Sequence, residues 1–140
     1  MVKIQRMSIG IATSIAILAL LDLLPSPVPQ SLVNYRLLDH FYVWPGIGGM
    51  VTMFVAAFGG GFVSKARFEI PAVILAVGVW VFIVYFLNST GAAAGQDDWL
   101  TVASTNLLGL ILGVFGAAFG AYAGTRMASR NSPGGNVAAV

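Results

Sequence analysis

The side chains best suited to chemistry lie at the end of the first apolar run of the chain and in the segment that connects it to the second. They are two carboxylates, a guanidinium and an imidazole, namely Asp22, Arg36, Asp39 and His40. Asp22 stands near the end of an apolar run, where a carboxylate is costly unless it reaches water or a partner. One interpretation is a proton or cation site at the outer mouth of a membrane protein. The alternative is an acid at a helix end that reaches the lipid headgroups, with His40 as a solvated residue nearby.

Other kinds of chemistry find little support in the sequence. The chain has one histidine and no cysteine, which excludes thiol catalysis and argues against a metal site. It contains no G-x-x-x-x-G-K pattern and no strand followed by G-x-G-x-x-G, so no phosphate-binding loop is indicated. The net charge of +2 is too small to favour nucleic acid. We therefore predict no enzyme activity, no metal, no cofactor and no nucleic-acid partner.

The elements that must position these residues are apolar helices. Only 9% of the 140 residues are charged, whereas an ordinary soluble domain has about 25%. This composition predicts an all-α integral membrane protein with a single domain, 1–130, and a disordered cytoplasmic tail, 131–140. Four apolar runs are long enough to cross the bilayer. They cover about 7–24, 47–63, 70–87 and 104–125.

The connections between these spans indicate how the helices are joined. The first run follows a basic start, as in a signal peptide, but it is longer than the usual core of roughly 7–15 residues, so we interpret it as an uncleaved helix. Segment 31–44 has apolar side chains at helical spacing and predicts a short amphipathic helix in the interface. Residues 65–69 leave no room for a folded loop between the second and third spans, which predicts a tight helical hairpin there. We interpret the four spans as a whole as two helical hairpins. Asp97 or Asp98 is a candidate cap for the last helix.

Glycines form a regular stripe on the last span. The steps between them are four, three, four and four residues, which places all of them on one face of a helix. They are Gly109, Gly113, Gly116, Gly120 and Gly124. A stripe of small residues lets a second helix approach closely in a membrane. We therefore predict that this glycine ladder is a helix-packing surface.

The second span resembles the fourth. Residues 54–59 match 115–120 at an offset of 61 positions, and the same offset pairs Gly48 with Gly109. A duplication would make the two hairpins a parallel internal repeat, in which Gly48 and Gly59 would face the ladder. The alternative is that alanine, phenylalanine and glycine are simply common in membrane helices.

The cations indicate the orientation. With four spans, six of the seven lysines and arginines share one side of the membrane with both termini. The positive-inside rule then predicts cytoplasmic termini in a multi-pass protein of the bacterial inner membrane. Four of these cations are candidate contacts for anionic lipid headgroups, although topology alone would place them there. They are Lys65, Arg67, Arg126 and Arg130.

Two functions are consistent with these patterns. The first is a structural or accessory protein whose glycine faces pack helices within the chain, against a second copy, or against a larger membrane complex. The alternative is a small oligomeric channel or transporter that uses the outer cluster of Asp22, Arg36, Asp39 and His40. Strong packing motifs and the near absence of polar residues inside the spans favour the first function. The lipid bilayer is a partner in either case.

Overall fold

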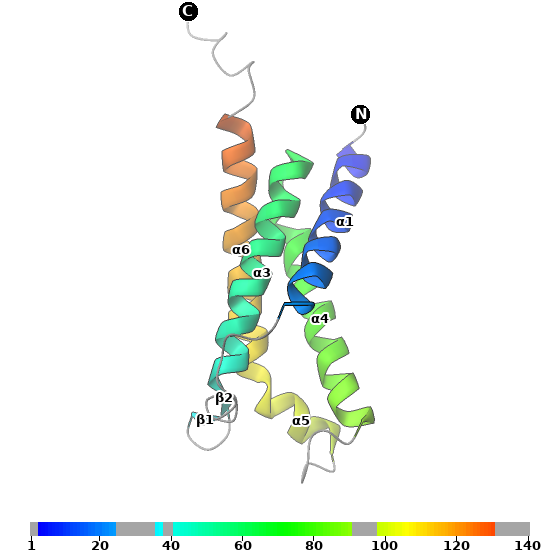
Figure 1. Cartoon of the computed structure of the whole chain (residues 1–140), viewed down its shortest axis with the longest axis vertical. Coiled ribbons are helices and arrows are strands. Elements are labelled where there is room, and N and C mark those ends of the chain that lie inside the picture. The colour runs from blue at the N-terminus through cyan, green and yellow to red at the C-terminus, as the bar shows by residue number, and fades with distance from the viewer. Residues whose placement is uncertain (1–2, 25–35, 38–40, 91–97, 131–140) are drawn as a thin grey trace, which may run out of the picture.

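The structure, a computed structural model, describes residues 3–24, 36–37, 41–90 and 98–130 (Figure 1). Within these ranges the chain forms five helices and one pair of short strands. Four of the helices are long and apolar enough to cross a membrane, which confirms the four predicted long helices and supports a multi-pass membrane protein. The elements are α1 (Lys3–Asp22), β1 (Arg36–Leu37), β2 (Phe41–Tyr42), α3 (Val43–Ser64), α4 (Glu69–Ser89), α5 (Trp99–Thr105) and α6 (Leu107–Arg130).

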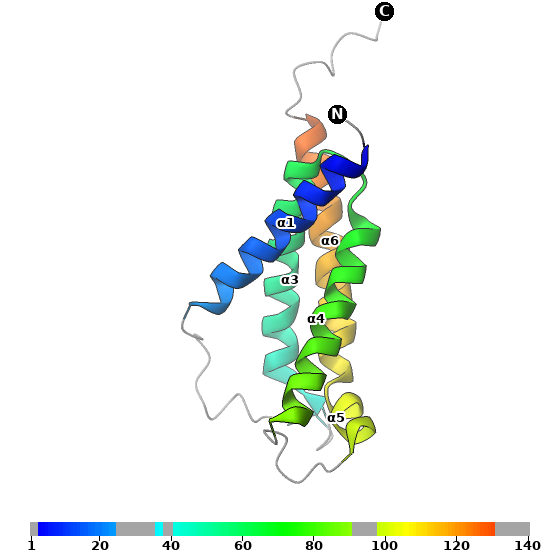
Figure 2. The same ribbon diagram turned by 90° about the vertical axis from the view of Figure 1, so that its right-hand side faces the viewer.

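Helices α3 and α6 form the centre of the fold. They lie side by side and run in the same direction along most of their lengths (Figures 1 and 2). Helix α1 packs mainly on α3, and α4 packs mainly on α6. Helix α4 makes few contacts with α3, although the two are consecutive in the chain. The fold is therefore a central parallel pair with one outer helix on each member.

The buried residues are mostly small. Alanine dominates the core, and the few large side chains that are fully buried include Phe68, Val84 and Val102. Most large apolar side chains point outward instead; Ile70 is 75% exposed and Phe119 is 64% exposed. This distribution suits a bilayer, because lipid tails are as apolar as leucine and burying large side chains inside the protein has little advantage there.

Helix α1 does not run parallel to the central pair. It crosses α3 obliquely, and its C-terminal end diverges from the other helices (Figure 2). The two leucines that follow the helix, Leu23 and Leu24, are exposed. The contact between α1 and α3 therefore runs from the buried Gly10 through Ser14 to Ile17, before the diverging end of α1.

The predicted interfacial helix over 31–44 is wrong where the structure describes that segment. Strands β1 and β2 pair antiparallel there, with Arg36 opposite Tyr42 and Leu37 opposite Phe41. A helix of this length is marginal unless it packs on a partner, and aromatic residues favour strands. Helix α3 then begins at Val43, earlier than predicted, with Pro45 in its first turn, where the missing N–H costs no helical bond. Residues 31–35 and 38–40 lie outside the described residues.

The connection from α3 to α4 is short and well bonded. Lys65 has a positive φ of 51° and donates its N–H to the Gly61 carbonyl at 3.3 Å, which ends α3 in a left-handed cap. The Thr125 hydroxyl of α6 donates to the Ala66 carbonyl at 3.1 Å. Helix α4 then starts at Glu69, with Pro71 buried in its first turn. The bond from Thr125 attaches the connection to the last part of α6.

The last span differs from its prediction as one continuous helix from 104 to 125. Asp98 caps the short α5 by accepting a hydrogen bond from the Leu100 N–H at 3.3 Å. The helix is interrupted at Asn106, and α6 then continues from Leu107 to Arg130. The Asn106 amide donates to the Val102 carbonyl at 2.8 Å, a local bond that competes with a continuous helix. The Trp80 indole of α4 donates to the Asn106 carbonyl at 2.9 Å. Asp97 lies outside the described residues.

Candidate functional site

Three glycines of the ladder lie directly against backbone carbonyls of α3. The pairs are Gly116 with Met50, Gly120 with Phe54, and Gly124 with Phe58. A Cβ added to Gly120 would overlap the Phe54 carbonyl oxygen and would lie 2.9 Å from its carbonyl carbon. The steps are four residues on both helices, so the same register is kept from one pair to the next. We call these three pairs the glycine seam.

The seam brings backbone against backbone. The Cα hydrogen of each glycine points at the carbonyl that a Cβ would strike, which is the geometry of a Cα–H···O contact worth about 0.5–1 kcal/mol. One contact has the glycine on α3 and the carbonyl on α6, because a Cβ added to Gly61 would lie 2.6 Å from the Ala121 carbonyl oxygen. The two helices are therefore too close at these glycines to admit a side chain in their place.

The other end of the ladder is open. A Cβ added to Gly113 would meet only Met53, at 3.9 Å from its Cγ, and one added to Gly109 would meet nothing within 4 Å. A pocket of about 100 Å³ lies here between α3, α4 and α6, beside the Trp80–Asn106 hydrogen bond. The tight contact is thus limited to the half of α6 that approaches the chain's C-terminus.

The two glycines predicted on α3 have different surroundings from the ladder. A Cβ added to Gly59 would meet the end of the Ile17 side chain of α1, and one added to Gly48 would meet nothing within 4 Å. Gly59 is therefore directed to α1 rather than to α6. The structure does not bring Gly48 and Gly59 together with the ladder.

A second glycine contact joins α1 to α3, and the sequence interpretation did not single it out. A Cβ added to Gly60 would lie 2.7 Å from the Gly10 carbonyl oxygen and 2.6 Å from the ring of Phe68. The buried Ser14 hydroxyl donates to the Ala56 carbonyl at 3.0 Å, which gives this crossing a hydrogen bond. The signal was present, since Gly10 precedes Ser14 by four residues in the small-x-x-x-small pattern of membrane helix contacts.

The outer cluster is only partly placed. Asp22 is the last residue of α1 and its side chain is exposed at the diverging end of that helix. Arg36 belongs to β1, paired with Tyr42. Asp39 and His40 lie outside the described residues. A site formed by these four residues therefore stays a prediction.

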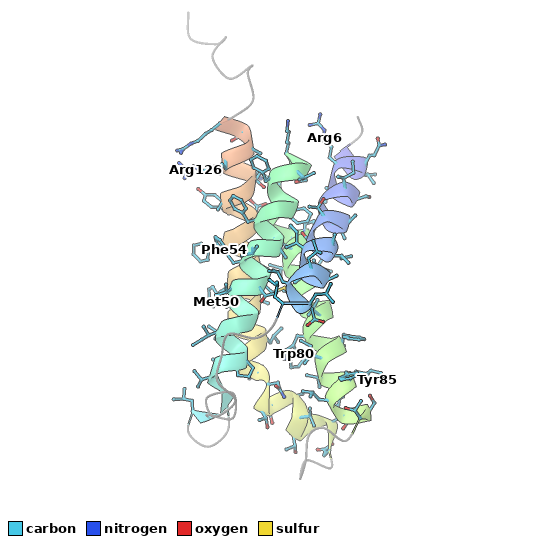
Figure 3. All side chains as sticks on the ribbon, viewed as in Figure 1. Arg6, Met50, Phe54, Trp80, Tyr85 and Arg126 are labelled. Carbon is cyan, nitrogen blue, oxygen red and sulfur yellow. The ribbon has the colours of Figure 1, made fainter. Side chains whose placement is uncertain are left out.

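The four candidate headgroup cations are exposed at one end of the helices. Lys65 and Arg67 lie in the connection after α3, and Arg126 and Arg130 lie in the last turns of α6. The Arg126 guanidinium donates to the Tyr122 hydroxyl at 2.9 Å and lies over its ring. Figure 3 shows Arg126 near the same end as Arg6 of α1. This end presents its cations to the surroundings rather than to the protein core.

Chemistry inside the described spans is limited. The buried hydroxyl groups of Ser14 and Ser64 donate to backbone carbonyls, at 3.0 and 3.1 Å. Among the described residues, every buried side-chain nitrogen and oxygen has a hydrogen-bond partner, and no three acidic or histidine side chains are grouped as metal ligands would be. The described interior can hold helices together, but it offers no reactive pair of groups.

Comparison of the chain with protein-family models, with curated proteins and with solved structures finds no match.

Proposed function

We propose that this chain is a structural or accessory membrane protein that assembles with a second copy or with a larger membrane complex. The observation that carries the proposal is the glycine seam, where α3 and α6 meet backbone to backbone. Contacts of this kind fix two helices rigidly without any reactive group. A rigid helical scaffold with an apolar outer surface is suited to presenting that surface to another membrane protein.

The seam also indicates which surface a partner would use. The ladder glycines from Gly116 to Gly124 already contact α3 within the chain, so they are covered. The outer side of the same two helices carries aromatic side chains at helical spacing instead. This aromatic face consists of Phe54, Phe58 and Phe62 of α3 with Phe115, Phe119 and Tyr122 of α6. We propose this face as the assembly surface.

The aromatic face has an ordered geometry. The rings of Phe54, Phe58 and Phe62 stack in sequence, with centroids 6.4 and 6.3 Å apart. Phe115 is 58% exposed and Phe119 is 64% exposed. Large aromatic side chains supply much contact area for little conformational entropy, which is why they are frequent at the centres of interfaces.

The test is the particle size of the chain extracted from its membrane in polymer-bounded discs. The wild-type chain should form particles that hold more protein mass than one protomer. The double variant Phe115→Leu and Phe119→Leu keeps the hydrophobicity and should shift these particles toward the protomer. The matched control is Phe82→Leu with Phe86→Leu, which changes an exposed stacked pair on α4 and should have no effect. A wild-type chain that is monomeric in these discs would refute the proposal.

A parallel repeat favours the second candidate, a small oligomeric channel or transporter. Its support is that α1 packs on α3 as α4 packs on α6, so the chain divides into two similar helix pairs. Many transporters are built from such repeats. The different neighbours of Gly59 and of its counterpart Gly120 weigh against exact symmetry. Ion flux into proteoliposomes that is lost with Asp22→Asn, while insertion is retained, would favour transport over assembly.

We also propose that both termini face the cytoplasm of a bacterial inner membrane. The start of α1, the connection after α3 and the end of α6 lie at one end of the bundle (Figure 1), and six of the seven cations belong to that end or to its extensions. The positive-inside rule supports this orientation.

A further inference from the structure

A crevice opens between α1 and the start of α4. It exists because α1 crosses α3 obliquely and makes few contacts with α4 (Figure 2). Its volume is about 540 Å³, within the range of roughly 300–1,000 Å³ that is typical of ligand sites. We call it the α1–α4 crevice. Its lining residues are Met7, Arg67, Glu69, Ile70, Pro71 and Ile74.

The lining of the crevice has an apolar part and a charged part. The apolar side chains follow α4 from Ile70 to Ile74, into the part of the helix that is long and apolar enough to cross the membrane. The charged side chains, Arg67 and Glu69, lie at the end where α4 begins. A molecule that fits this lining has a polar head at the membrane surface and an apolar tail along α4.

The charges of Arg67 and Glu69 limit which headgroups can bind in the crevice. Arg67 and Glu69 line the same crevice, yet within the described chain they form no ion pair with each other at 4.0 Å or less. Arg67 can therefore bind an oxygen anion from outside the protein, and a guanidinium suits phosphate because of its paired donors. Glu69 can accept hydrogen bonds from an ammonium group. A purely anionic head would instead be repelled by the Glu69 carboxylate.

We propose that the α1–α4 crevice binds a phospholipid whose headgroup carries both a phosphate and a primary ammonium, of the phosphatidylethanolamine type. The phosphate lies against Arg67, the ammonium against Glu69, and an acyl chain along Ile70 and Ile74. For Arg67, this proposal replaces the broader expectation of an anionic lipid with a headgroup that carries both charges. It does not depend on the aromatic face, so the two proposals can fail separately.

The proposal is tested by native mass spectrometry of the full chain in detergent, titrated with three phospholipids that share the same acyl chains. The first binding site should prefer phosphatidylethanolamine over phosphatidylcholine and phosphatidylglycerol by about tenfold or more, the effect of one charge-assisted hydrogen bond. Choline has no N–H to donate, and glycerol has no positive charge. Water-soluble phosphoethanolamine at the same concentration should not displace the bound lipid, because it lacks the acyl chain.

Two variants assign the roles of the charged groups. Glu69→Gln should remove most of the preference for phosphatidylethanolamine over phosphatidylcholine and should improve the binding of phosphatidylglycerol. Arg67→Gln should weaken all three lipids at the first site. Lys65→Gln is the matched control, because it removes a neighbouring exposed cation that does not line the crevice. Equal affinity for the three lipids, an unchanged preference in Glu69→Gln, or displacement by phosphoethanolamine would overturn the proposal.

Discussion

The substitution Gly120→Ala adds a single methyl group at the middle of the glycine seam. That methyl would overlap the Phe54 carbonyl oxygen and lie 3.0 Å from the Phe54 Cα, and neither belongs to a flexible side chain that could move aside. Helices α3 and α6 must therefore separate locally. Overpacking of this kind costs about 1–3 kcal/mol, and the lost Cα–H···O contact costs about 0.5–1 kcal/mol more.

The matched control is Gly109→Ala on the same helix face. Its methyl would meet nothing within 4 Å, so only the gain in helix propensity remains, which is about 1 kcal/mol in water. Both variants receive that gain, and it cancels when they are compared. The free energy of unfolding should therefore be about 1.5–4 kcal/mol lower for Gly120→Ala than for Gly109→Ala.

The assay is unfolding of the purified chain in mixed micelles by increasing mole fraction of sodium dodecyl sulfate, followed by the fluorescence of the three tryptophans. Gly120→Ala should unfold at a clearly lower fraction of the denaturing detergent than the wild type, and Gly109→Ala at an equal or higher one. Gly116→Leu should be still less stable, whereas Leu110→Ala, which lies off the glycine stripe, should lower the free energy of unfolding only slightly. Equal unfolding of the two alanine variants would refute the reasoning, because it would mean that the ladder faces lipid along its whole length.

Three further predictions concern other parts of the fold. Gly60→Ala should lower the free energy of unfolding by about 1–3 kcal/mol in the same assay, because it disrupts the crossing of α1 and α3. Gly59→Ala should be tolerated, because only the end of a flexible side chain is in its way. Equal effects of the two variants would contradict the close contact at Gly60. Trp80→Phe should cost about 0.5–1.5 kcal/mol through loss of the hydrogen bond at the break before α6, and an unchanged free energy of unfolding would argue against that bond. A reporter fused after Val140 should be active only if it works in the cytoplasm, and one inserted at Gly95 should report the opposite side; a cytoplasmic Gly95 would exclude the four-span topology.

The sequence was sufficient to predict the four long helices. Their apolar runs are long and carry almost no charge, and this signal is local, so it does not depend on how the helices pack. The beginning of α4 was also predictable, because Glu69 and Pro71 suit a first helical turn wherever the helix lies.

The parts that the sequence did not predict depend on tertiary contacts. Spacing showed that the ladder glycines share a face, but only the packing shows that Gly116 is covered and Gly109 is open. At the break, the Asn106 carbonyl accepts a hydrogen bond from Trp80 on another helix, a contact that the local sequence does not indicate. Apolar spacing alone predicted a helix over 31–44, but Arg36 and Tyr42 are paired in strands. Local patterns do not carry this information.

The central claim is that α3 and α6 of one chain pack in parallel at the register of the glycine seam. The chain has no cysteine, so a cysteine pair can be introduced cleanly. A Cβ at Gly113 would lie 3.9 Å from the Met53 Cγ, which places Met53→Cys and Gly113→Cys within reach of a disulfide. The control pair, Met53→Cys with Gly124→Cys, is displaced by about 16 Å along α6.

The measurement is disulfide formation in membranes under mild oxidant, resolved by electrophoresis without reductant and by the mass of the linked peptides. The first pair should form a bond within one chain, and the control pair should form none. A disulfide that links two chains, or a bond in the control pair but not in the first, would contradict the packing of α3 against α6 described here.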